Sequence, residues 1–147
     1  MNKRIIKFRI WDTKANKYYS WDEIWYSVVK VPNGCFQGQT EEIWCSFFGM
    51  AVNNPNMIVQ QFTGLLDKNG KEIYEGDIVC NKYVDSSGIL HEQFCVMCFG
   101  KYRSELHMHE GIGFYLEDIN ENKEIWFNFK DFIVVGNIFE NPELIKV

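Results

Sequence analysis

The stretch that decides the fold is Gln61–Val79, which reads QFTGLLDKNGKEIYEGDIV. Its first turn is Asp67–Gly70, and the Asn-Gly pair there accommodates positive φ at both central positions of a type I′ turn. Short apolar segments flank this turn, so the stretch predicts a tight β-hairpin. Its second turn is Glu75–Asp77, where Gly76 is free to adopt a conformation closed to other residues.

After this stretch the chain alternates strand-like runs with turn residues. The predicted strands are Ile78–Val84, Ile89–Phe99, Gly111–Leu116, Glu124–Phe129 and Phe132–Phe139. Gly100 is expected to end the second of these, with Lys101–Glu110 as an extended loop, and Asn141–Leu144 suits a final helical turn. Short strands separated by turns at intervals of about ten residues favour a small β-barrel.

The N-terminal part is also rich in strand-like patterns. Arg4–Trp11 alternates apolar and charged residues, as in a half-buried strand. Further predicted strands or buried segments are Tyr18–Trp21, Glu41–Phe48 and Met57–Phe62. We therefore expect an all-β protein, with an N-terminal β-rich segment at 1–56 and a C-terminal SH3-like barrel at 57–147; the alternative is that both form one compact unit.

Trp21–Lys30 is ambiguous between helix and strand. Ser20 followed by Glu23 has the spacing of a helix capping box. The run Trp25–Val29 is nevertheless a good strand sequence, and we favour a strand preceded by a short turn.

Composition narrows the class of protein. The 147 residues are 46% hydrophobic and 16% aromatic, with a net charge of −5. An acidic chain is not expected to be a general nucleic-acid binder, although Lys3, Arg4, Lys7 and Arg9 form a local basic cluster. The absence of a signal-like or membrane-spanning segment, and an odd number of cysteines, five, predict a cytoplasmic protein with free thiols.

One group of residues has the ligand types of a zinc site. Cys95, Cys98, His107 and His109 form a C-x-x-C followed by H-x-H. The two cysteines lie in a strand-like run, where residues three apart point to opposite faces, and no turn lies between them. We therefore favour two small buried side chains and expect no metal and no cofactor.

The sequence offers little for catalysis. Glu75, Asp77 and Asp67 are close in sequence and could form an acid–base pair. A better interpretation is that Asp77 accepts hydrogen bonds from turn amides. The chain lacks a phosphate-binding loop, a nucleophile elbow and a metalloprotease motif, so we expect no enzyme.

Aromatic residues crowd the N-terminal third of the chain. A layer of this size can bury only part of them, and the remainder would form an exposed interaction patch. The predicted patch residues are Trp11, Trp21, Trp25, Tyr26 and Trp44.

Gln61–Val79, together with Val134–Ile145 (VVGNIFENPELI) and the opening segment Ile6–Asp12, resembles the YopX family of phage and prophage proteins. The resemblance implies a β-rich fold with an SH3-like barrel in the C-terminal part and an origin in a phage or prophage genome. It implies no catalytic residues.

These observations predict a phage-encoded accessory protein in the bacterial host cytoplasm, acting by self-association, as a homo-oligomer, or by binding a host or phage protein. The first alternative is a nucleic-acid-binding small-barrel module, since such barrels present aromatics to bases. The second is an enzyme.

Overall fold

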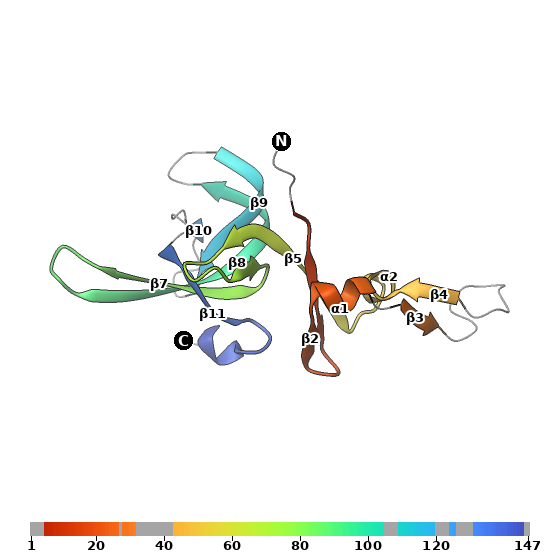
Figure 1. The fold of residues 1–147 in the computed structure, drawn as a ribbon. Helices are drawn as coiled ribbons and strands as arrows, with labels where there is room; N and C mark the ends of the chain where they lie inside the picture. Colours follow the sequence, from red (N-terminus) through yellow and green to blue (C-terminus); the bar gives the residue numbers. More distant parts are fainter. Residues whose placement is uncertain are drawn as a thin grey trace. The chain divides into compact units, whose positions relative to one another are not determined.

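The computed structural model describes residues 5–26, 28–31, 43–104, 109–119, 124–125 and 131–145. The described part is mainly β-structure, which confirms the all-β expectation (Figure 1). The chain folds as two compact units, Lys7–Gln61 and the part from Phe62 onward together with the first residues of the chain. The division lies inside strand β5 (Met57–Leu66).

The unit Lys7–Gln61 is built on an antiparallel sheet. β1 (Phe8–Asp12) pairs with β2 (Lys17–Tyr19) on one side and with β5 on the other. The remaining elements are α1 (Trp21–Tyr26), β3 (Val28–Val31), β4 (Ile43–Ser46), which pairs with β3, and α2 (Phe47–Val52). The core of this unit is Ile10, Ile24 and Ala51, with Tyr19, Phe48, Met57 and Val59 packed around it.

The strand favoured for Trp25–Val29 was wrong at Trp25 and Tyr26, which belong to α1, whereas Val28 and Val29 lie in strand β3. The capping box decides this. The Ser20 amide donates to Glu23 Oε2 at 2.7 Å, and the Glu23 amide donates back to Ser20 Oγ at 3.4 Å. The hydrogen bond from the Ser20 backbone lowers the pKa of Glu23. A helix was also missed at Phe47, where the predicted strand Glu41–Phe48 gives way to α2.

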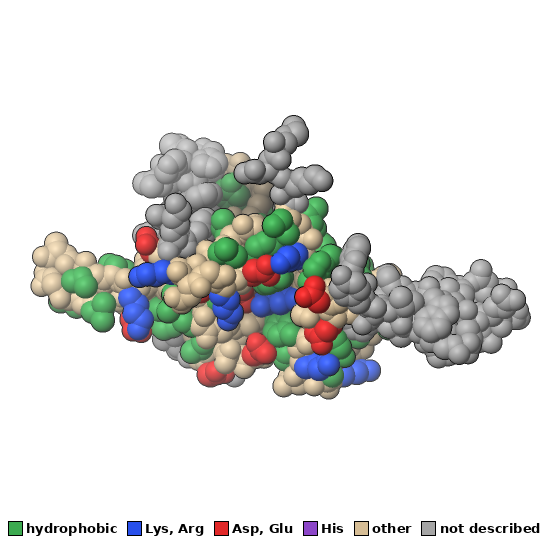
Figure 2. Space-filling view, viewed as in Figure 1, with side chains coloured by type: hydrophobic (Ala, Val, Ile, Leu, Met, Phe, Trp, Pro, Cys, Tyr) green, Lys and Arg blue, Asp and Glu red, His purple; other side chains and the backbone are tan. Residues whose placement is uncertain are grey.

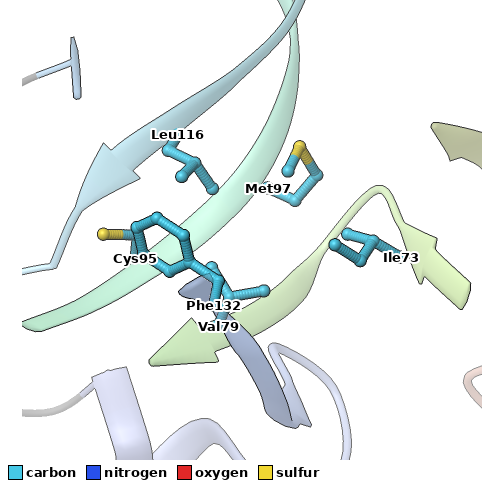
Figure 3. Close-up of a cluster of buried hydrophobic side chains, with 6 residues drawn as sticks. All are labelled: Ile73, Val79, Cys95, Met97, Leu116 and Phe132. Atoms are coloured by element: carbon cyan, nitrogen blue, oxygen red, sulfur yellow. The ribbon is translucent and has the colours of Figure 1, made fainter. Parts of the chain in front are cut away.

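The second unit contains the five-stranded antiparallel sheet β10-β9-β8-β7-β11. Its strands are β7 (Asp77–Val84), β8 (Leu90–Ser104), β9 (His109–Asp118), β10 (Glu124–Ile125) and β11 (Ile133–Asn137). β6 (Glu72–Tyr74) pairs with the second half of β5, and η2 (Pro142–Ile145) is the predicted final helical turn. The core is Ile73, Val79, Cys95, Met97, Leu116 and Phe132, whose side chains come together from several strands (Figure 3).

The turn at Asp67 forms the predicted hairpin, but its type was predicted wrongly. Gly70 has φ +84°, whereas no positive φ occurs at Asn69. The Gly70 amide donates to the Asp67 carbonyl at 2.9 Å, and the Asp67 amide donates to the Lys71 carbonyl at 2.8 Å. This is a type I turn followed by a left-handed glycine, because only one position has to adopt positive φ. Asp85–Gly88 repeats the same turn between β7 and β8, with Gly88 at φ +81°.

β8 does not end at Gly100 as predicted, and part of the expected loop Lys101–Glu110 is strand. Gly100 pairs with Gly113, and Tyr102 pairs with Gly111. A Cβ atom at Gly111 would lie 2.6 Å from the ring of Tyr102, so the tyrosine ring lies directly on the glycine backbone. The glycines of β8 and β9 therefore leave room for tyrosine rings to pack against the sheet, and they do not end the strand.

Candidate interaction surface

The distal part of the β7–β8 hairpin carries an exposed apolar surface. We call residues Asn81–Gln93 the arm; it extends away from the core of its unit (Figure 1). Tyr83 is 46% exposed, Val84 62%, Ile89 57% and Leu90 60%. Apolar side chains lie in the open at this projection, at the left of the space-filling view (Figure 2). Val84 and Leu90 lie opposite each other across the hairpin and share one face, whereas Tyr83 pairs with His91 on the other face.

The charged groups of the arm are paired within it. Lys82 Nζ forms an ion pair with Glu92 Oε1, directly across the two strands. His91 Nε2 lies 2.7 Å from Asp85 Oδ2, and this hydrogen bond is the main reason why the pKa of Asp85 is lowered. The His91 ring also stacks on Tyr83, with centroids 5.2 Å apart and planes 18° apart. The arm therefore presents an apolar surface with nearly balanced charge.

Within the described residues, the arm is a ribbon of two antiparallel strands, with no further strand beside its tip. β11 pairs with β7 only as far as Cys80, and β9 pairs with β8 only from Cys95 onward. Within the residues that the structure describes, no third strand pairs with Asn81–Val84. An open strand edge offers backbone donors and acceptors to another strand.

The cysteines of the candidate zinc site lie on opposite faces of β8. Cys95 is fully buried in the core, whereas Cys98 is half-buried with its Sγ 3.6 Å from Glu117 Oε2. Burial, reinforced by Asp118, raises the pKa of Cys95 to about 12. Burial and the Glu117 carboxylate raise the pKa of Cys98 to about 12 as well. Both thiols therefore remain protonated at neutral pH.

The structure describes only one of the two histidines of that candidate site, and only its backbone. His107 lies outside the described residues, and His109 is described only as the first residue of β9. Over the part of the chain that the structure describes, no three His, Cys, Asp or Glu side chains come together as a metal site would require.

Of the five residues predicted for the aromatic patch, the structure describes the side chains of Trp11 and Trp21. Trp11 is only 4% exposed and packs against Tyr18 with ring centroids 4.8 Å apart, so it does not belong to an exposed patch. Trp21 is half-buried, 5.9 Å from the ring of Phe8. The side chains of the other predicted members, Trp25, Tyr26 and Trp44, lie outside the described part.

Arg9, from the basic N-terminal cluster, is engaged within its own unit. Its guanidinium lies 4.5 Å from the centroid of the Tyr18 ring, and its Nε donates to Gln60 Oε1 at 2.9 Å. Tyr18 donates its hydroxyl hydrogen to the same oxygen, also at 2.9 Å. These contacts hold the two strands that flank β1 together.

The buried carboxylates of Asp67 and Asp77 accept hydrogen bonds from backbone amides and so fix nearby turns. Asp77 accepts a hydrogen bond from the Tyr74 amide at 2.8 Å, as predicted, and another from Asn137 Nδ2 at 3.2 Å. Asp67 Oδ1 accepts from the amides of Asn69 and Lys71, both at 2.8 Å. Its Oδ2 accepts from the Val134 amide at 3.0 Å, which ties the hairpin turn to β11.

The arm was missed at the sequence level. Its only local signal is the placement of Tyr83-Val84 and Ile89-Leu90 immediately beside a polar turn. That pattern is equally typical of a hairpin whose ends are covered by other strands, so exposure could not be predicted.

The described part of the chain forms two mainly β units, one of them with a five-stranded antiparallel sheet, which places the protein in the mainly β class. The chain belongs to the YopX family: the family model described as YopX protein matches residues 7–146. Among solved structures it is similar to protein EF1440 from Enterococcus faecalis, with a TM-score of 0.54 and 23% identity. That similarity covers 98% of this chain and 100% of the other, and at this identity it concerns the fold alone. No curated protein matches the chain. None of the helices in the described residues is long and apolar enough to cross a membrane.

Proposed function

We propose that this protein is a phage- or prophage-encoded accessory protein that acts by binding, either to itself or to a host or phage protein. The observation that carries the proposal is the apolar surface of the arm. Its four exposed apolar side chains, which are 46–62% exposed, give both faces of the hairpin apolar groups that a partner could contact. The family membership supports the phage or prophage origin.

We infer further that the second unit is an SH3-like small barrel. β8 supports this because it pairs with β7 over Leu90–Val96 and with β9 over Cys95–Ser104. A long strand that changes partner along its length is how a sheet turns a corner and folds over its own core. Phe132, fully buried, fills that core from the segment preceding β11.

A binding role fits the chemistry of the described polar groups better than catalysis does. The carboxylates of Asp67 and Asp77 accept hydrogen bonds from backbone amides and, for Asp77, from the Asn137 side chain. The thiols of Cys95 and Cys98 are held in the protonated, unreactive form. Free Cys80, Cys95 and Cys98 suit the reducing cytoplasm of a bacterial host.

The experiment is affinity capture with the tagged full chain from phage-infected bacterial cells, beside light scattering of the pure protein. The matched variants are Leu90→Lys, which places a charge on the arm, and Ile112→Lys, which does the same at a 79% exposed position of β9. Binding to itself or to a protein that is lost only in Leu90→Lys is the expected result. A strictly monomeric chain that captures no protein, or that instead binds DNA more tightly at low salt, would contradict the proposal.

A further inference from the structure

Asn69 and Gly70 form a chemically reactive pair at exposed positions of the β5–β6 turn. Where glycine follows asparagine, no side chain shields the glycine amide nitrogen from the asparagine carboxamide. In the reaction this nitrogen gives up its proton and attacks Asn69 Cγ. The new N–Cγ bond closes a five-membered imide, and the carboxamide nitrogen leaves as ammonia. Water then opens the imide at one of its two carbonyls, which yields an aspartate or an isoaspartate at position 69.

Hydrogen bonds in the folded turn make the Gly70 nitrogen a poor nucleophile. The Gly70 amide donates to the Asp67 carbonyl at 2.9 Å. Asp67 Oδ1 accepts from the amides on either side of Gly70, those of Asn69 and Lys71, both at 2.8 Å. The carboxylate therefore lies beside the amide that must lose its proton, and its negative charge disfavours the anion that would form.

The backbone of Asn69 also keeps the nucleophile away from the carboxamide. Asn69 occupies the third position of a type I turn, where ψ is about 0°. Ring closure requires the Gly70 nitrogen to eclipse Asn69 Cβ about the Cα–C bond, an orientation that lies roughly 120° away from this ψ. The turn must therefore open before the imide can form.

Contacts with a segment distant in the sequence hold the turn closed. Asp67 Oδ2 accepts from the Val134 amide at 3.0 Å, and the Lys68 amide donates to the Phe132 carbonyl at 2.9 Å. Phe132 is fully buried, so these contacts connect the turn to the core of its unit. Opening of the turn breaks them together with the hydrogen bonds inside the turn, and the open form is accordingly rare.

We propose that Asn69 is a deamidation site controlled by the turn at Asp67: the residue is protected while the turn is closed and reacts when it opens. The inference does not depend on the proposed binding function. An isoaspartate product directs the main chain through Cβ and so adds one backbone atom to the turn. Either product places a second carboxylate close to that of Asp67, where like charges repel. The reaction is irreversible, so modified molecules accumulate as the turn opens.

The first test compares the folded and the urea-unfolded full chain during incubation at mildly alkaline pH. Mass spectrometry of peptides digested at acidic pH measures deamidation, and chromatography separates the aspartyl from the isoaspartyl peptides. Asn69 should react about tenfold or more slowly in the folded chain. Asn33-Gly34, the other Asn-Gly pair of the sequence, lies outside the described residues and gives a reference rate in the unfolded chain. Equal rates at Asn69 in the folded and unfolded chains would refute the protection.

The variant Asp67→Ala tests the cause of the protection. It removes the carboxylate from the amides of Asn69 and Lys71 but leaves the Asn-Gly pair itself unchanged. Deamidation of Asn69 should be about fivefold or more faster than in the folded wild type. An unchanged rate would refute control by Asp67, and circular dichroism shows whether the variant remains folded.

The turn between β7 and β8 provides the same test at an exposed hairpin tip, even where Asp67→Ala does not fold. Ser87 occupies the position equivalent to Asn69: its amide donates to Asp85 Oδ1 at 2.8 Å, and the next amide, that of Gly88, donates to the Asp85 carbonyl at 3.0 Å. Ser87→Asn therefore places an Asn-Gly pair in the same kind of turn. This pair should react more slowly in the folded than in the unfolded chain, and adding Asp85→Ala should accelerate it by about fivefold or more. Equal rates with and without Asp85→Ala would overturn the proposal.

Discussion

The hydrogen bonds of Asp67 predict a large and specific loss of stability when its carboxylate is removed. Asp67 is only 6% exposed and connects the β5–β6 turn to β11. Burial by itself would raise the pKa of Asp67, but hydrogen bonds from the amides of Val134, Lys71 and Asn69 outweigh it and hold the pKa below its usual range. The substitution Asp67→Ala removes all three acceptor contacts at once.

The cost follows from what each amide can do afterwards. The Val134 amide lies in a half-buried strand, and a donor left without an acceptor there costs about 1–3 kcal/mol. The amides of Asn69 and Lys71 belong to exposed residues, where water replaces the carboxylate at about 0.5 kcal/mol each. The total loss is about 3 kcal/mol, which lowers the urea midpoint by roughly 1.5 M if the denaturant slope is about 2 kcal/mol/M.

Asp85→Ala is the matched control, assayed by urea unfolding followed by circular dichroism. Asp85 caps the same kind of turn through the amides of Ser87 and Ile89, but it makes no hydrogen bond to a third strand that the structure describes. We expect a clearly smaller shift of the midpoint in this variant. Equal shifts for the two variants would refute the argument that the contact with Val134 carries the difference.

The pH dependence gives a second check on Asp67. Because its pKa is lower in the folded than in the unfolded state, its contribution is present above the ordinary pKa of an aspartate and is lost as pH falls through the folded value. The stability difference between wild type and Asp67→Ala should therefore be full at pH 7 and shrink below about pH 4. A difference that stays constant down to pH 2 would contradict the role of the ionised carboxylate.

Three further predictions concern the core, the first helix and the thiols. Phe132→Ala, at a fully buried position, should cost about 3–5 kcal/mol in urea unfolding, whereas Ile112→Ala should change stability by less than about 0.5 kcal/mol. Ser20→Ala removes one half of the capping box and should destabilise the unit containing α1 by about 1 kcal/mol, seen as faster amide exchange in that helix; unchanged exchange would contradict the role of the cap. Because their pKa values lie near 12, Cys95 and Cys98 should react with iodoacetamide at pH 8 far more slowly in the native than in the urea-unfolded protein, and rapid native labelling in peptide mass spectra would show that burial does not protect them.

The elements that sequence predicted well are those held by short-range interactions. The Asp67–Gly70 hairpin and the turn at Gly76 depend on residues within a few positions of each other, and both form. The turn type was predicted wrongly because an Asn-Gly pair fits two local geometries. A type I′ turn needs positive φ at both residues, whereas a type I turn followed by a left-handed glycine needs it at the glycine only. The capping box of α1 is also local, and its reciprocal hydrogen bonds between Ser20 and Glu23 outweigh the strand-forming tendency of the residues that follow.

The wrong predictions concern residues whose structure depends on neighbours that are distant in the sequence or lie on another strand. Gly100 was expected to end a strand, yet it pairs with Gly113 of β9 beside the ring of Tyr115, and β8 continues to Ser104. Trp11 was expected in an exposed patch, yet the ring of Tyr18 and the strands around it bury it. Neither neighbour could be identified from the spacing of residues along the chain.

By itself, the sequence determined the β-rich class, the positions of the reversals and the membership of the YopX family, because turn chemistry, side-chain alternation and family motifs are all written in neighbouring residues. The tertiary structure alone decided which apolar side chains are covered. Val79 and Tyr83 lie on the same strand and the same face, but Val79 is buried under Phe132 and its neighbours while Tyr83 extends past the last pairing of β11. Burial depends on which strands end where, and that is settled only when segments far apart in the chain pack together.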